Sequence, residues 1–150
     1  MLQKLNTKRG GFTLVEIMIV VAIIALLASI AVPNFLRSRK RSQATQVLED
    51  LRLIDAAIDQ YAIENAKKAG DAADWDDIKA YLKTGTRLYN SVGVDILGET
   101  FNNGSAYEID TIPVVNDATF EALSDVAPED FWGPHYSSGS SQPGNSGGGS

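Results

Sequence analysis

Apolar residues run without interruption through one stretch near the start of the chain. Twenty residues, IMIVVAIIALLASIAVPNFL, separate Glu16 from Arg37, and none of them is charged. A helix of this length spans about 30 Å, the thickness of the hydrocarbon core of a bilayer. Because the apolar side chains surround the whole helix, the pattern predicts a segment that lies in lipid or deep inside protein.

The pattern becomes amphipathic beyond this stretch. Apolar residues recur at intervals of four, three, four and three positions, at Val47, Leu51, Ile54, Ile58 and Tyr61. This spacing places them on one face of a helix. No glycine and no proline other than Pro33 occurs between Phe12 and Ala69. We therefore expect one helix over 12–69, bent at Pro33, with a membrane and assembly segment at 12–36 and an amphipathic spine at 37–69.

Shorter helices are predicted in the head, which we place at residues 70–136. Gly70 closes the long helix, and Asp74 caps a helix from Trp75 to Lys83 that buries its aromatic and aliphatic side chains. Asn116 or Asp117 caps another helix, with Phe120, Leu123 and Val126 turned inward, which ends by Pro128.

Two strands are predicted between these helices. Val92–Leu97 and Ala106–Val115 have strand composition, and Asn102-Asn103-Gly104 forms the turn region between them. Pro113 indicates an edge position for the second strand, since it has no amide to donate. The expected fold class is α+β, a small antiparallel sheet with helices packed on a long helical spine. Eleven of the last fourteen residues, 137–150, are Ser or Gly, which predicts a disordered tail.

Charge is distributed unevenly along the chain. The net charge is -6, but residues 71–150 contain thirteen acids and only three bases. An acidic head argues against nucleic-acid binding, which needs a basic face. A basic cluster, Arg37, Arg39, Lys40 and Arg41, follows the apolar stretch. We favour contact with lipid headgroups for this cluster, and a partner-binding site is the alternative.

Residues typical of catalytic or metal chemistry are scarce. The chain has no cysteine and one histidine, His135, which we expect to be an exposed loop residue beside the tail. The acids between Asp71 and Asp77 lack the spacing and glycine of a calcium-binding loop, so a helix cap with a solvated face explains them better. No phosphate-binding loop or nucleophile motif is visible. We therefore name no catalytic residue, metal ligand or cofactor.

Three classes of N-terminal segment could contain the apolar stretch. An ordinary signal peptide has a shorter apolar region, about 7–15 residues, followed by its cleavage site. A plain anchor accounts for the hydrophobicity but gives Glu16 no role, although a carboxylate at the headgroup level would be tolerated there.

The residues before the apolar stretch favour a third class. Gly11-Phe12-Thr13-Leu14-Val15-Glu16, after a short basic leader, resembles the signature of type IV prepilins, a family that includes pilus subunits and type II secretion pseudopilins. The resemblance covers about residues 1–45, and the position of Pro33 is also similar to the family.

This resemblance implies how the chain is processed. A prepilin peptidase would remove the leader, residues 1–11, by cutting between Gly11 and Phe12, and would methylate the new Phe12 amine. The absence of a side chain at Gly11 gives a protease close access to the scissile carbonyl. Glu16 would contact the Phe12 amine of a neighbouring subunit during assembly. Pro33 is either a tolerated kink or a flexible point used when the subunit leaves the bilayer.

The expected function follows from these roles. The resemblance implies a structural subunit, not an enzyme, in a homo-oligomeric filament of a type II secretion pseudopilus or related system. Its partners would be the prepilin peptidase, the secretion or pilus assembly machinery and the bacterial inner membrane, with the head in the periplasm. The lack of cysteine and the short head favour a pseudopilin over a type IV pilus subunit. A membrane anchor that never polymerises is a further alternative.

Overall fold

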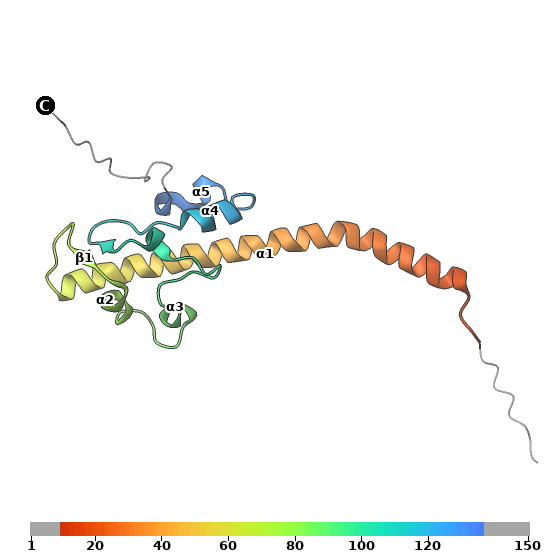
Figure 1. Ribbon diagram of the computed structural model, residues 1–150, viewed down its shortest axis with the longest axis horizontal. Helices are drawn as coiled ribbons and strands as arrows, with labels where there is room; N and C mark the ends of the chain where they lie inside the picture. Colours follow the sequence, from red (N-terminus) through yellow and green to blue (C-terminus); the bar gives the residue numbers. More distant parts are fainter. Residues whose placement is uncertain (1–9, 137–150) are drawn as a thin grey trace, which may run out of the picture. The chain divides into compact units, whose positions relative to one another are not determined.

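The computed structural model describes residues 10–136, so the predicted leader residues 1–9 and the predicted tail 137–150 lie outside the described part. Its elements confirm the predicted α+β class (Figure 1). In chain order they are α1 (Leu14–Glu64), β1 (Ala72–Ala73), α2 (Trp75–Lys79), α3 (Arg87–Asn90), η1 (Phe101–Gly104), β2 (Tyr107–Glu108), α4 (Asp117–Leu123), α5 (Glu129–Trp132) and η2 (Gly133–His135).

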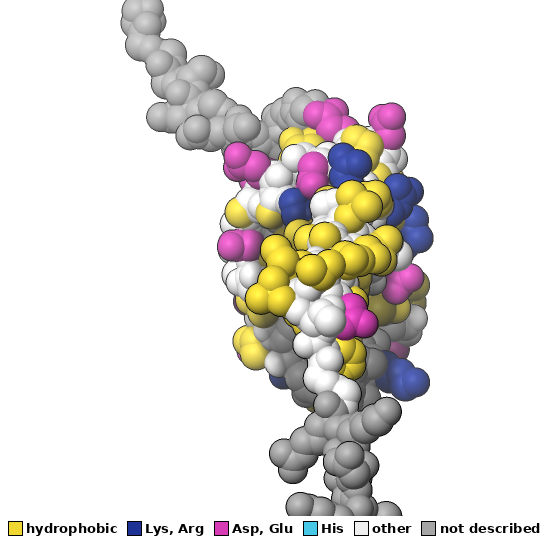
Figure 2. All heavy atoms as spheres, turned by 90° about the vertical axis from the view of Figure 1, so that its right-hand side faces the viewer, with side chains coloured by type: hydrophobic (Ala, Val, Ile, Leu, Met, Phe, Trp, Pro, Cys, Tyr) yellow, Lys and Arg dark blue, Asp and Glu magenta, His cyan; other side chains and the backbone are white. Residues whose placement is uncertain are grey.

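The chain divides into two compact units, and the boundary lies between Ser38 and Arg39. In the N-terminal unit, every large apolar side chain from Phe12 to Leu36 is more than half exposed. Figure 2 shows hydrophobic side chains gathered on the face turned toward the viewer. This part of α1 is long and apolar enough to cross a membrane, and none of its most apolar window is buried within the chain.

The C-terminal unit is built around the second part of α1. In Figure 1, α2 and α3 lie on one side of this helix, and α4 and α5 lie on the other. The predicted stripe is confirmed, because all five of its residues are buried: Val47, Leu51, Ile54, Ile58 and Tyr61. The core around them includes Ile78 from α2, Leu123 from α4 and Trp132 from α5.

The long helix ends earlier than the sequence predicts, at Glu64 and not at Ala69. Ala66 adopts a left-handed conformation, with φ of 50°. The amide of Lys67 then donates to the carbonyl of Ala62 over 3.0 Å, and the side chain of Asn65 donates to the carbonyl of Tyr61 over 2.9 Å. These bonds satisfy the last helical carbonyls in the manner of a Schellman motif. Alanine occupies the position where glycine is usual, so the sequence carries no signal for this end.

The sheet is smaller than predicted and pairs different segments. β1 and β2 are antiparallel, with Ala72 opposite Glu108 and Ala73 opposite Tyr107. Only Tyr107–Glu108 of the second predicted strand is therefore extended and paired. Asp110 turns the chain with φ of 68°, and the amide of Val115 donates to the carbonyl of His135 instead of to a strand.

The first predicted strand, Val92–Leu97, is wrong apart from an isolated bridge between Val94 and Thr100. The reason is Asp95, whose carboxylate Oδ1 accepts from the amides of Leu97 and Glu99. A side chain that bonds its own neighbouring amides offers the backbone an alternative to a sheet ladder. The predicted turn region is confirmed, since Asn102 and Asn103 both have positive φ.

The starts of the predicted short helices are confirmed, but their lengths are not. α2 begins at Trp75 behind a capping box formed by Asp74 and Asp77, and it ends at Lys79 instead of Lys83. α4 begins behind Asn116, whose side chain accepts from the amide of Ala118. Leu123 is buried as expected, while Phe120 and Val126 are only partly buried.

Candidate processing and assembly site

The start of α1 is fixed by a reciprocal pair of hydrogen bonds between Thr13 and Glu16. The amide of Glu16 donates to Oγ1 of Thr13 over 3.2 Å, and the amide of Thr13 donates to Oε2 of Glu16 over 2.8 Å. The Thr13 hydroxyl also donates to Oε2, over 2.8 Å. This arrangement is a capping box, which satisfies two amide donors at a helix N-terminus.

Some amides and one carboxylate oxygen beside the capping box have no hydrogen-bond partner within the described residues. Among the described residues, no acceptor is found for the amides of Leu14 and Val15, which are the next donors of the first turn. The second carboxylate oxygen of Glu16, Oε1, also makes no hydrogen bond within the described part of the chain. The helix start can therefore accept a further donor at Oε1 while Oε2 remains bound to Thr13.

Gly11 and Phe12 precede the cap and are exposed. A Cβ atom at Gly11 would meet no other atom within 4 Å, so the fold itself places no restriction on a side chain there. Phe12 is 85% exposed and lies immediately before the N-cap residue. The structure therefore brings Phe12 and Glu16 to the same helix start, and α1 begins two residues beyond Phe12 at Leu14.

Pro33 is also placed within the apolar part of α1, and the helix continues through it. Proline removes the amide that would donate to the carbonyl of Ser29, one turn earlier. The hydroxyl of Ser29 donates in turn to the carbonyl of Leu26 over 2.7 Å. Several turns of helix separate Pro33 from Glu16, so the proline does not belong to the capped helix start.

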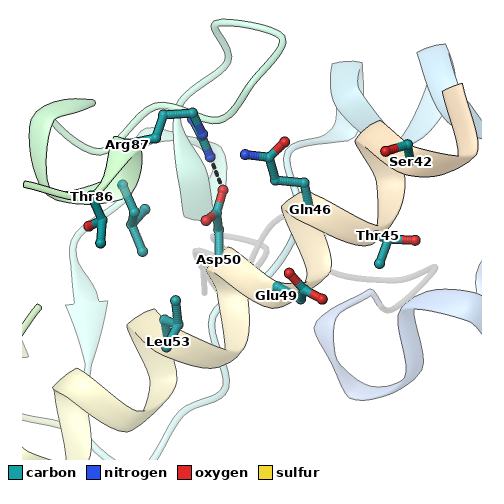
Figure 3. A pocket seen from close by; sticks show the side chains of 9 residues that line it. Ser42, Thr45, Gln46, Glu49, Asp50, Leu53, Thr86 and Arg87 are labelled. Atoms are coloured by element: carbon teal, nitrogen blue, oxygen red, sulfur yellow. Dashed lines mark hydrogen bonds and ion pairs between the residues drawn. The ribbon is translucent and has the colours of Figure 1, made fainter. Parts of the chain in front are cut away.

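A groove in the C-terminal unit is a second candidate site. It has a volume of about 550 Å³ and lies between α1 and the start of α3. Figure 3 shows the side chains of Asp50 and Arg87 pointing toward each other across it, joined by an ion pair. The Asp50 side chain is only 10% exposed, so its charge needs this partner. The pair therefore attaches α3 to the spine, and we assign it a structural role.

Other ionisable groups in the described residues do not assemble into a metal site. No group of three or more His, Asp or Glu side chains within residues 10–136 is arranged to hold a metal ion. The acids of the Asp71–Asp77 stretch instead make local bonds, as Asp77 does to the amide of Asp74 over 3.0 Å.

The prediction that His135 is exposed is wrong. Its side chain is buried, and Nδ1 lies 2.9 Å from the carbonyl oxygen of Pro113. The final described segment folds back on the region around residue 113, and the rings of Phe120 and Tyr136 stack there with centroids 3.8 Å apart. A pattern local to residues 131–136 does not reveal this contact, because the covering segment lies about twenty residues away.

Thr13 is the site residue that the sequence reasoning missed. The spacing Thr-x-x-Glu before an apolar run is the signature of a capping box, and Thr13-Leu14-Val15-Glu16 matches it. This signal was present within the prepilin-like hexapeptide. It identifies Thr13 as the partner of Glu16 inside a single chain.

Comparison with known proteins gives matches to the N-terminal part of the chain. The family model for the prokaryotic N-terminal methylation motif matches residues 6–32. The type II secretion system core protein G of Klebsiella pneumoniae is 37% identical over 60 residues, 40% of this chain and 43% of that protein. The same-named protein of Escherichia coli K12 is 38% identical over 58 residues, 39% of this chain and 40% of that protein.

A pilus protein matches over a similar length. The type IV major pilin protein PilA of Myxococcus xanthus is 44% identical over 54 residues, 36% of this chain and 24% of that protein. The matched region thus spans less than half the length of each of these relatives. No solved structure matches the chain with significance. The N-terminal part of the chain therefore carries the prokaryotic N-terminal methylation motif, and there it is similar to type II secretion core proteins and to a type IV pilin.

Proposed function

We propose that this protein is a pseudopilin, a structural subunit of a type II secretion pseudopilus or a related type IV filament. A prepilin peptidase cuts the precursor between Gly11 and Phe12 and methylates the Phe12 amine. The mature subunit is held in the bacterial inner membrane by the first part of α1, with its head in the periplasm. The secretion or pilus assembly machinery then moves it from the bilayer into a homo-oligomeric filament.

The observation that carries this proposal is the capped helix start beside an uncovered apolar helix. Every large apolar side chain from Phe12 to Leu36 is more than half exposed, which in water would be unfavourable for a solitary chain. A bilayer covers this surface in the free subunit, and neighbouring copies of the helix cover it in a filament. The same helix thus serves as an anchor first and as an assembly element afterwards.

Glu16 supports the assembly role because it has unused bonding capacity. Within lipid or a bundle of helices, an unpaired amine or amide lacks water as a partner. Oε1 of Glu16 can accept from the Phe12 amine of a neighbouring subunit while Oε2 keeps the Thr13 cap. Pairing of a carboxylate with an ammonium group is stronger away from water, so this contact would fix the register between neighbours.

Two other functions remain as alternatives. The first is a subunit of an extended type IV pilus, which the match to a major pilin favours. The matches to type II secretion core proteins favour the pseudopilus instead. The second alternative is an anchor that never polymerises, with a head that binds a partner. In that case Oε1 of Glu16 would have no partner to accept from.

The test is expression of the precursor with and without a prepilin peptidase and the matching assembly machinery. Mass spectrometry of membrane-extracted protein should give a chain that begins at methylated Phe12 only when the peptidase is present. Electron microscopy of sheared surface material then separates a long surface pilus from a pseudopilus. An unprocessed chain in the presence of an active peptidase would contradict the proposal, and a processed chain that never forms filaments would support the anchor.

A further inference from the structure

The basic residues at the start of the C-terminal unit form a distinct charged surface. We call Arg39, Lys40 and Arg41 the basic collar. Arg39 and Arg41 are exposed and Lys40 is partly exposed. No acidic residue occurs between Glu16 and Glu49, so α1 supplies no carboxylate close to these cations. Two residues earlier in the sequence, Arg37 adds a further positive charge.

The position of the basic collar matches the headgroup level of a bilayer. The uncharged stretch of α1 ends at Leu36, after a length that spans one hydrocarbon core. The collar begins within one helical turn of that point. The orientation of the segment in the membrane does not explain why these cations are present. Basic residues also precede the apolar stretch, and the positive-inside rule concerns only the cytoplasmic side.

Within the described part of the chain, only one of the three collar residues forms an ion pair with the head. Nζ of Lys40 lies 2.9 Å from Oδ1 of Asp125, which follows α4. Arg39 and Arg41 make no ion pair with any residue in the described part of the chain. Successive residues are turned by about 100° around a helix, so these two arginines point to sides of α1 that are roughly 200° apart.

The directions of Arg39 and Arg41 around the helix favour a lipid surface over a protein partner. A single partner protein that docks on one side of the helix would meet only one of the two arginines. Lipid headgroups surround a spanning helix and present phosphate on every side. The rest of the C-terminal unit is unsuited to an anionic surface, since residues 49–136 contain eighteen acids and six bases. Attraction is therefore confined to the collar.

We infer that the basic collar binds the phosphates of anionic phospholipids in the leaflet that faces the head. Arg39 and Arg41 contact lipid directly, and the Lys40–Asp125 pair orients the head above the surface. Extraction of the subunit must break these contacts, so anionic lipid would hold the free subunit back. The inference needs only that the apolar stretch spans a bilayer, and it does not depend on filament assembly.

The experiment uses the full chain in nanodiscs of phosphatidylcholine that contain a minor share of phosphatidylglycerol. Native mass spectrometry after release counts the lipids that stay bound. Wild type should retain phosphatidylglycerol in excess of its share, and each arginine should contribute roughly fivefold to this preference. The double variant Arg39→Gln/Arg41→Gln should therefore lower this preference by roughly 25-fold, and Arg37 and the basic residues before the apolar stretch account for any preference that is left.

A matched variant removes two charges elsewhere on the same unit. Lys68→Gln/Lys83→Gln alters two exposed head lysines and should keep the wild-type preference. Inorganic phosphate should displace no more phosphatidylglycerol than sodium chloride of equal ionic strength, since a free phosphate ion lacks the membrane surface. The inference is overturned if wild type shows no preference or if the arginine variant keeps it. Loss of cross-links between copies in that variant, with the lipid preference kept, would assign the arginines to a protein partner.

Discussion

Thr13 and Glu16 close the first turn of α1 by exchanging hydrogen bonds. The Thr13 amide donates to the Glu16 carboxylate over 2.8 Å, and the Glu16 amide donates to the Thr13 hydroxyl over 3.2 Å. Glu16 thus has a role within the subunit in addition to the role between subunits that we propose. The two roles use different carboxylate oxygens, so substitutions at position 16 can separate them.

Glu16→Gln should keep the helix start but lose assembly. Glutamine also serves in a capping box, so the bond from the Thr13 amide is retained. The negative charge for a neighbour's Phe12 amine is lost, and an unpaired buried charge costs several kcal/mol. We expect processing and membrane insertion as in wild type, with at least a roughly tenfold lower ratio of filamentous to membrane-bound protein.

Glu16→Ala removes both roles and is the matched comparison. It should assemble as poorly as Glu16→Gln and should also expose the amide of Thr13 to faster hydrogen exchange in lipid. If Glu16→Gln assembles as wild type does, the charge of Glu16 has no partner in the filament. Only an absence of filaments in wild type itself would support the anchor function.

Gly11→Leu should abolish removal of the leader without disturbing the fold. Space around Gly11 is open, with no atom within 4 Å of the position that a Cβ atom would occupy, so a leucine is tolerated by the chain itself. A branched side chain next to the scissile carbonyl should block the peptidase. Mass spectrometry of membrane-extracted protein should find the full precursor, and a mutant that still begins at methylated Phe12 would show that the cleavage site is elsewhere.

The features that the sequence predicted well are those with a local cause. The stripe from Val47 to Tyr61 follows from helical periodicity, and the starts of α2 and α4 follow from Asp74 and Asn116 as caps. Features that depend on contacts between distant segments were missed. His135 is buried by its contact with Pro113, and β2 pairs with Ala72–Ala73, which no strand pattern marks.

The same distinction between local features and contacts of distant segments applies to the candidate site. Gly11, Phe12 and Glu16 were predicted from a compact motif and their roles stay predictions, while the structure places the last two at one helix start. The ion pair of Asp50 and Arg87 was not recognised, because the two residues are 37 positions apart. Periodicity marks Asp50 only as a polar position beside the buried stripe. Its burial depends on α3, which no sequence signal predicted.

A chain that begins at Ser42 should be soluble, folded and monomeric. It lacks the apolar stretch and the basic collar but keeps the buried stripe from Val47 to Tyr61. It also loses the Lys40–Asp125 pair, whose side chains are 44% and 47% exposed. An exposed pair contributes at most about 1 kcal/mol, so the loss is tolerable. Light scattering and circular dichroism test this, and a folded spectrum with aggregation would mean that the head leaves too much of α1 uncovered.

Asp50→Ala should destabilise the head far more than Lys40→Ala. Removing one partner of a buried ion pair leaves the other charge without compensation, and we expect a loss of about 2–3 kcal/mol in the free energy of unfolding. Lys40→Ala breaks an exposed pair and should cost less than about 1 kcal/mol. Urea denaturation of the soluble head carrying Asp50→Ala tests the first value. The value for Lys40→Ala must be measured on a chain that begins before Lys40, and this chain is kept in detergent.

A double-mutant cycle measures the coupling itself. Arg87→Ala should be destabilising as well, and Asp50→Ala/Arg87→Ala should lose less stability than the two single losses added together. Additive losses would show that the ion pair does not attach α3 to the spine.

Asp55→Asn should stabilise the head at neutral pH. Burial raises the pKa of Asp55 above its ordinary value of 3.8, and repulsion from Asp59 adds to this, while His135 acts in the opposite direction. The folded state thus binds a proton at Asp55 more readily than the unfolded state does. The stability that this group contributes is fully present below the unfolded pKa and is lost as the pH rises through the folded pKa. Asparagine cannot ionise, so its advantage should be largest near neutral pH and should disappear as the pH falls below about 3.8. Denaturation of the two proteins over this pH range provides the measurement, and an advantage that does not change with pH would mean that the carboxylate of Asp55 is not the cause.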